Sequence, residues 1–327
     1  MTLIRTHSKQ NPLLELVSKQ GVLIALALLL LFGALRYDGF LGVYNLSSVL
    51  RYNSMFGLIA LGMCFVIITG GIDLSVGSVV AFSSVIAAQL SPNGALVGLI
   101  VPVLAGTGLG LINGLVITRL GLQPFIATLA MLLGARGLAL LLAGNQSVGI
   151  SSESNFSIIG QGDFLGLPIP ALILFGAFAL GALLLSSSAF GRYALAIGGN
   201  EDASKLMGLP VARVKLGVYT LSGGLAGLAG VILASQFGAG QPTEGLGWEL
   251  SAIASVVVGG TLLTGGMGSV WNTLSGAILL GLIFNILNFE NGKGIISLSP
   301  YWQSVIRGAF LLLVVVLQNR LSRGKSG

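Results

Sequence analysis

Long apolar stretches, separated by short polar connections, dominate the pattern of this 327-residue chain. A helix needs about 20 mostly apolar residues to cross a bilayer. The stretches are continuous rather than alternating, which predicts an all-α integral membrane protein and not a β-barrel. We expect about ten spans, at residues 18–35, 52–69, 74–90, 95–118, 122–143, 168–186, 216–236, 249–265, 269–287 and 301–318. Two of them, 74–90 and 249–265, are short enough to be either full or broken helices.

The composition excludes most classes of soluble protein. Hydrophobic residues make up 54% of the chain and charged residues 8%, and the mean hydropathy is +0.96. Ordinary soluble domains carry about 25% charged residues, so 16 basic and 10 acidic side chains could not cover a soluble enzyme of this size. The single cysteine, Cys64, allows no internal disulfide and no metal cluster. The 50 glycines instead favour close packing of helices in lipid.

The basic residues predict the orientation in the membrane. If the N-terminus is inside, eleven of the 16 Lys and Arg residues fall in inner segments and three in outer ones, as the positive-inside rule requires. Both termini are then cytoplasmic, with tails at 1–17 and 319–327 around one transmembrane domain at 18–318. Because the basic residues lie in short connections and tails, the net charge of +6 is explained by the membrane topology and does not indicate nucleic-acid binding.

Two connections between spans are long. The outer one, 144–167, is rich in Ser, Gly and Asn and is expected to be a surface loop. In the inner one, 187–215, Asn200 is placed to cap a short helix over 201–206, which Gly208 and Pro210 would end. Such a helix is either a docking element for another protein or a solvated turn. The residues of the candidate docking element are Gly199, Asn200, Glu201, Asp202, Ala203, Ser204, Lys205 and Gly208.

A five-residue pattern occurs twice in the chain. GIDLS at residues 71–75 recurs as GWELS at 247–251, and each copy opens an expected span. The acidic residues of the two copies, Asp73 and Glu249, lie about half the chain apart. Because five spans separate the copies, they point in opposite directions. The pattern therefore predicts two inverted five-helix repeats, as in many transport proteins.

Four charged residues, Asp73, Arg136, Glu249 and Arg307, lie within or beside the expected spans. A charge at the centre of a span costs about 2.5–3.5 kcal/mol, so it normally faces a partner or a cavity. We expect an internal partner for Arg136, and for Arg307 either a carbonyl partner or contact with the interface. Asp73 and Glu249 either cap the helix that follows or belong to a translocation path. The candidates for the path or its gate are Asp73, Ser75, Ser78, Glu249, Ser251 and Ser255.

Residues suited to catalysis are scarce. His7 is the only histidine, so Ser–His catalysis and a zinc site both lack their side chains, and we expect no metal or cofactor. A transporter is the stronger hypothesis, and an ion-coupled secondary carrier of a small polar solute is the alternative, because such carriers also use inverted repeats. An ATP-driven transporter would need a separate ATPase chain, since the sequence has no Gly-x4-Gly-Lys-Ser/Thr loop.

Several motifs occur in a fixed order along nearly the whole chain. They are TGGIDLSVGS at 69–78, QPFIATL at 123–129, GRY at 191–193, AIGGNE at 196–201, QPT at 241–243 and ELSAIASVVVGGT at 249–261. Together they resemble the motifs of the ribose-type sugar permeases of ABC importers. One residue departs from the family pattern, because Ser251 stands where the family usually has an aspartate, which removes an acidic pair with Glu249.

The resemblance implies a permease subunit of a type II-like, binding-protein-dependent ABC importer in the bacterial inner membrane. It implies pairing with an identical copy or a sister permease, cytoplasmic ATP-binding subunits that dock on residues 199–208, and a periplasmic sugar-binding protein. ATP would drive alternating access of a pore between two permeases, so this chain itself would be no enzyme. The default cargo is a pentose such as ribose, while hexoses, polyols and signalling sugars stay open.

Overall fold

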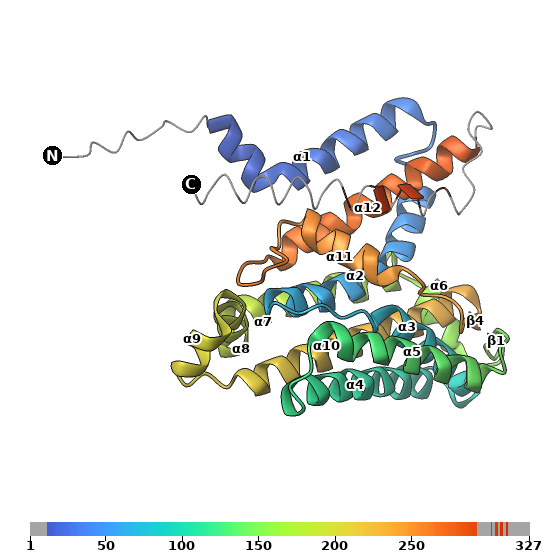
Figure 1. The fold of residues 1–327 in the computed structure, drawn as a ribbon. Helices are drawn as coiled ribbons and strands as arrows, with labels where there is room; N and C mark the ends of the chain where they lie inside the picture. Colours follow the sequence, from blue (N-terminus) through green and yellow to red (C-terminus); the bar gives the residue numbers. More distant parts are fainter. Residues whose placement is uncertain (1–11, 293–301, 303–304, 307, 310–311, 313–327) are drawn as a thin grey trace.

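The computed structural model describes residues 12–292, 302, 305–306, 308–309 and 312 (Figure 1). Arg307, the tail at 319–327 and most of the expected span at 301–318 lie outside the described residues. Six of the described helices are long and apolar enough to cross a membrane. They are α2 (Val43–Ile68), α4 (Ala95–Arg119), α5 (Pro124–Ala143), α7 (Ile169–Ser187), α10 (Val211–Phe237) and α12 (Val270–Gly292).

Three further helices, α1 (Pro12–Arg36), α3 (Val76–Leu90) and α11 (Trp248–Val258), coincide with expected spans. Two helices begin before the spans expected in them, since α1 begins at Pro12 and α2 at Val43, whereas the expected spans begin at residues 18 and 52. The expected span at 249–265 is broken. Helix α11 ends at Val258, and three glycines of the 259–269 turn, Gly260, Gly265 and Gly266, have positive φ, a conformation that glycine adopts without steric cost.

The outer connection lies on the surface, as its composition predicts, but it folds into a cap of short helices and strands. Phe156 is fully buried in a cluster with Ala87, Val231 and Ala234, so one aromatic ring anchors the segment. Strand β1 pairs antiparallel with β4, which follows α10, and β2 pairs with β3. The small elements are η1 (Ser91–Asn93) after α3, then β1 (Val148–Gly149), η2 (Asn155–Ser157), α6 (Ile158–Gln161), β2 (Asp163–Phe164), β3 (Leu167–Pro168) and β4 (Ala239–Gly240).

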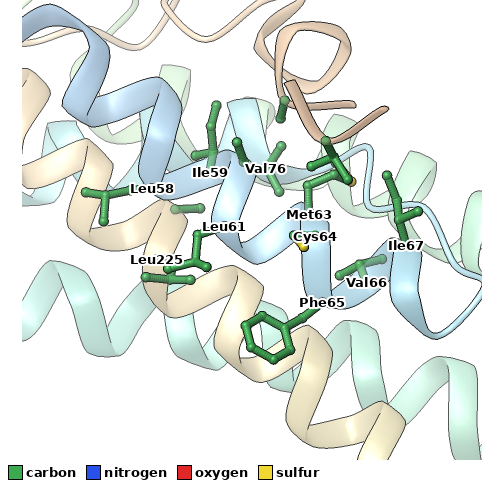
Figure 2. Close-up of a cluster of buried hydrophobic side chains, with 14 of the residues drawn as sticks. Leu58, Ile59, Leu61, Met63, Cys64, Phe65, Val66, Ile67, Val76 and Leu225 are labelled. Carbon is green, nitrogen blue, oxygen red and sulfur yellow. The ribbon is translucent and has the colours of Figure 1, made fainter. Parts of the chain in front are cut away.

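Helix α2 forms the centre of the apolar core. Nearly every side chain from residue 53 to 68 is buried. Figure 2 shows side chains of α2 in one cluster with Val76 of α3 and Leu225 of α10. A helix that is apolar around its whole circumference is expected where protein surrounds it on all sides.

Helices α4 and α10 approach closely through glycines. Gly106 and Gly110 on α4 face Gly223 on α10, and a methyl group added at Gly110 would overlap the Tyr219 carbonyl oxygen. Small residues let helix backbones approach in lipid, where van der Waals packing rather than the hydrophobic effect drives association. This interface accounts for part of the glycine excess.

The two long connections lie at opposite ends of the helices (Figure 1). Helices α8 (Ala189–Gly199) and α9 (Glu201–Leu206) lie together at one end, and β1, β4 and α6 lie at the other. Helix α10 runs the full distance between them, since it begins shortly after α9 and ends beside β4.

Candidate functional site

Helix α9 is built as its sequence predicts. The Asn200 side chain accepts a hydrogen bond from the Ala203 backbone N–H at 2.9 Å, and Gly208 ends the helical conformation with φ of +76°. Ser204 is fully buried, and its hydroxyl donates to the Asn200 carbonyl oxygen at 2.8 Å. The helix expected over 201–206 is confirmed.

Glu201 ties α9 to the beginning of α10. Its carboxylate pairs with Lys215 of α10 and lies 3.0 Å from Lys205 Nζ, which also lies 3.4 Å from Asp202. Burial alone would raise the pKa of Glu201, but the hydrogen bonds from Lys215 and Lys205 outweigh it and lower that pKa. The hydrogen bond to Glu201 raises the pKa of Lys205. Both side chains are therefore charged at neutral pH.

The tip of α9 exposes two large apolar side chains, with Leu206 90% and Met207 68% accessible. Beside them, the α4–α5 connection and the beginning of α10 enclose a groove of about 830 Å³, whose lining includes Gln123, Arg213 and Lys215. Exposed apolar groups rimmed by charged residues are typical of a surface that binds another protein.

Asp73 lies in the packed interior, 1% exposed, in the connection between α2 and α3. Its Oδ1 accepts hydrogen bonds from the Ser75 backbone N–H at 3.0 Å and the Ser75 hydroxyl at 2.6 Å, and its Oδ2 accepts one from the Ser222 hydroxyl at 2.9 Å. Asn113 of α4 donates to Ser75 Oγ at 3.0 Å. We call Asp73, Ser75, Asn113 and Ser222 the Asp73 cluster. The bond from the Ser75 N–H closes a local turn before the helix. Helix α3 begins at Val76, with Ser75 as its N-cap residue and no side-chain capping hydrogen bond, so Asp73 orders the turn that precedes α3 and does not cap the helix itself.

Several polar residues around Asp73 are not among the sequence candidates. Asn113 and Ser222 complete the cluster, and Thr128 of α5 accepts a hydrogen bond from the Leu74 backbone N–H at 3.1 Å. The buried Tyr219 hydroxyl, close to Gly71, has no hydrogen-bond partner within the described part of the chain. The sequence contained one clue to these residues, because each is a polar side chain inside an apolar span. Such a side chain is expected to have an internal partner, but the sequence does not identify that partner.

The two copies of the repeated motif lie next to one another. Gly77, in the first turn of α3, packs against the Gly245 carbonyl just before α11. A methyl group added at Gly77 would lie 3.0 Å from Glu249 Oε2. The structure thus brings the beginnings of α3 and α11 together, although about half the chain separates them.

Arg136 holds the non-helical segment 241–247 that precedes α11. Its Nη1 donates to the carbonyl oxygens of Pro242 at 2.6 Å and Glu244 at 2.5 Å. These contacts give Arg136 internal partners, and both are backbone groups. In lipid, backbone carbonyls outside a helix need such donors.

The remaining gate candidates lie along α3 and α11. Ser78 and Ser255 are each 2% exposed, and the Ser255 hydroxyl donates to the Ser251 carbonyl oxygen at 2.9 Å, within α11. Ser251 itself is half-buried. In this structure Ser78 and Ser255 lie in the packed interior.

Comparison with known proteins identifies the family. Residues 45–315 match the family model described as "Branched-chain amino acid transport system / permease component". The chain belongs to this permease family. The permease is 40% identical over 322 residues to the ribose import permease protein RbsC of Bacillus subtilis (strain 168), covering 98% of each chain.

Two further relatives are similar over nearly their whole length. The Escherichia coli (strain K12) ribose import permease protein RbsC is 37% identical, covering 92% of the permease and 94% of that protein. The L-arabinose transport system permease protein AraH of the same strain is 36% identical, covering 93% and 92%. No solved structure gives a significant match. Family membership and the apolar helices make this chain a multi-pass permease of the bacterial inner membrane, not an enzyme.

Proposed function

We propose that this permease is the membrane subunit of an ATP-driven, binding-protein-dependent importer of a pentose, with ribose as the first substrate to test. The observation that carries the proposal is the similarity to ribose import permeases over nearly the whole chain. The relatives named for L-arabinose also point to a pentose. These relatives do not favour the alternative, an ion-coupled secondary carrier.

The proposal includes ten spans in two inverted five-helix repeats, with both termini in the cytoplasm. Six candidate spans lie in the described residues, α1, α3 and α11 would supply three more, and the apolar stretch at 301–318 would be the tenth. The contact between Gly77 and Gly245 supports the repeats, because it joins the beginnings of the two helices that follow the repeated motif. The opposite placement of α9 and β1 supports the assignment of inner and outer ends.

Cytoplasmic ATP-binding subunits would dock on α9, and a periplasmic sugar-binding protein would deliver the cargo at the opposite end. A second permease, either an identical copy or a sister chain, would complete the pore. Leu206 and Met207 support the docking assignment, because their exposed side chains would be buried by a partner at the end where α9 lies. Residues 199–208 would thus be the contact through which ATP closure moves the permease.

Alternating access would act on the beginnings of α3 and α11. Asp73, Ser75 and Ser78 lie on one side of this contact and Glu249, Ser251 and Ser255 on the other, which makes them the proposed gate. Because these side chains bond mainly to the protein itself, the pore would hold sugar weakly and selectivity would rest with the binding protein.

The test is transport by the reconstituted system. The permease would be purified with the ATPase and binding protein encoded beside it and placed in liposomes with labelled ribose, L-arabinose or leucine. We expect ribose uptake that requires both ATP and the binding protein. Uptake driven by an ion gradient in vesicles that lack the ATPase would overturn the proposal in favour of a secondary carrier. Preferred uptake of leucine would overturn the assignment of a pentose as the cargo.

A further inference from the structure

Five glycines from three separate segments meet next to α9, and we call this contact the glycine junction. Its members are Gly70 after α2, Gly198 and Gly199 at the end of α8, and Gly265 and Gly266 in the 259–269 turn between α11 and α12. The Gly266 backbone N–H donates a hydrogen bond to the carbonyl oxygen of Ile68, the last residue of α2, at 2.9 Å. The three segments thus touch through their backbones.

Three of the junction glycines, Gly198, Gly265 and Gly266, leave no room for a side chain. A methyl group added at Gly198 would overlap both the Ile68 carbonyl oxygen and the Gly266 nitrogen. One added at Gly265 would lie 2.9 Å from the Gly70 nitrogen and 3.1 Å from the Gly198 Cα. Glycine has no side chain that could change rotamer when a neighbouring segment moves. A shift of any one of the three segments must therefore move the other two.

Each segment of the junction leads to a different part of the proposed machinery. Helix α8 continues through Asn200 into α9, and the end of α2 continues from Gly70 to Asp73 within three residues. The 259–269 turn continues from the C-terminal end of α11, whose first turn carries Glu249. The junction therefore joins the docking helix to the proposed gate segments of both repeats.

We propose that the glycine junction transmits the movement of α9 to the Asp73 cluster and to α11, with Gly198 and Gly266 as positioning residues. This inference rests on the proposed function, since it assumes that an ATPase moves α9. Packed backbones with two discrete arrangements carry such coupling better than flexible side chains.

The test is the ratio of sugar transported to ATP hydrolysed by the complete reconstituted importer carrying Gly198→Ala. We expect assembly and ATP hydrolysis within about twofold of the unmodified importer, while the ratio falls about tenfold, the size of an ordinary allosteric coupling. The matched control is Gly108→Ala on α4, where an added methyl group meets nothing within 4 Å. A merely structural role would lower hydrolysis and transport together and leave the ratio unchanged, which would overturn the inference.

Hydrogen exchange on the unmodified importer keeps the inference testable if Gly198→Ala does not fold. On binding a non-hydrolysable ATP analogue, we expect changed exchange in residues 200–208 together with residues 69–75 and 262–268. A change in 200–208 with none in either of the other two segments would overturn the inference while leaving the proposed function intact. An unmodified importer that transports sugar without ATP would instead overturn the proposed function.

Discussion

The Ser222 hydroxyl on α10 donates a 2.9 Å hydrogen bond to Asp73 Oδ2, although the two residues are 149 positions apart. One belongs to each predicted repeat, so this bond joins the two halves of the permease inside its packed interior. Asp73 could act either as a hydrogen-bonding residue or as a charged gate. The two roles can be distinguished by removing the charge, because hydrogen bonding to Ser222 would survive that change and a charge-dependent gate would not.

We expect Asp73→Asn to keep most of the stability and transport of the permease. An Asn side chain still accepts from the Ser75 N–H, and its amide can donate to Ser222. Asp73→Leu leaves the Ser75 and Ser222 hydroxyls without this acceptor, which costs about 1–3 kcal/mol for each unsatisfied group. The measurements are the Tm in detergent and ATP-driven uptake. Lost transport in a normally stable Asp73→Asn variant would show that the gate depends on charge.

The ion pairs of Glu201 should make α9 sensitive to acid. The pKa of Glu201 is lowered in the folded protein, so its stabilising effect is complete above the unfolded value of about 4.3 and is lost as pH falls through the folded value. We expect Glu201→Gln to lower the Tm at pH 7 and to have no effect at a pH below the folded value. A Tm difference that persists unchanged in acid would assign the effect of the substitution to packing.

Leu206→Ser should weaken ATPase binding without destabilising the permease. The side chain is 90% exposed, so its removal costs little in the free permease, whereas an apolar side chain buried at the centre of an interface contributes about 2 kcal/mol or more. Co-purification of the ATPase should fall at least about tenfold at an unchanged Tm. The matched control is Leu165→Ser in the outer cap, since Leu165 is 87% exposed. Equal ATPase binding by both variants would contradict docking on α9.

Arg136→Met should release the segment at 241–247. The substitution keeps an apolar chain but removes the donor to the Pro242 and Glu244 carbonyl oxygens. Only the Pro242 carbonyl lies in a partly buried bond, and leaving a buried group of this kind unsatisfied costs about 1–3 kcal/mol. We expect a lower Tm and faster hydrogen exchange in 241–249. The exposed Arg192 on α8 provides the control Arg192→Met, for which neither should change. Unchanged exchange in Arg136→Met would mean that the segment is held by its contact with Gly77.

The sequence by itself determined the membrane class, the approximate spans, the α9 helix with its Asn200 cap, and the family. These features depend on local patterns, such as the length of an apolar stretch or a polar residue one position before a helix. The tertiary structure decided which residues meet: Ser222 and Asn113 with Asp73, Arg136 with two carbonyls, and the glycines of the junction with one another.

The reason is the uniformity of an apolar chain. When nearly every span is hydrophobic on all sides, the sequence does not distinguish the face that packs on protein from the face that meets lipid, and a glycine or serine can lie on either. The same limit explains why the sequence left open whether the span at 249–265 is broken, and why it did not predict the burial of Phe156. Both depend on close contacts between segments distant in the chain, which only the folded arrangement supplies.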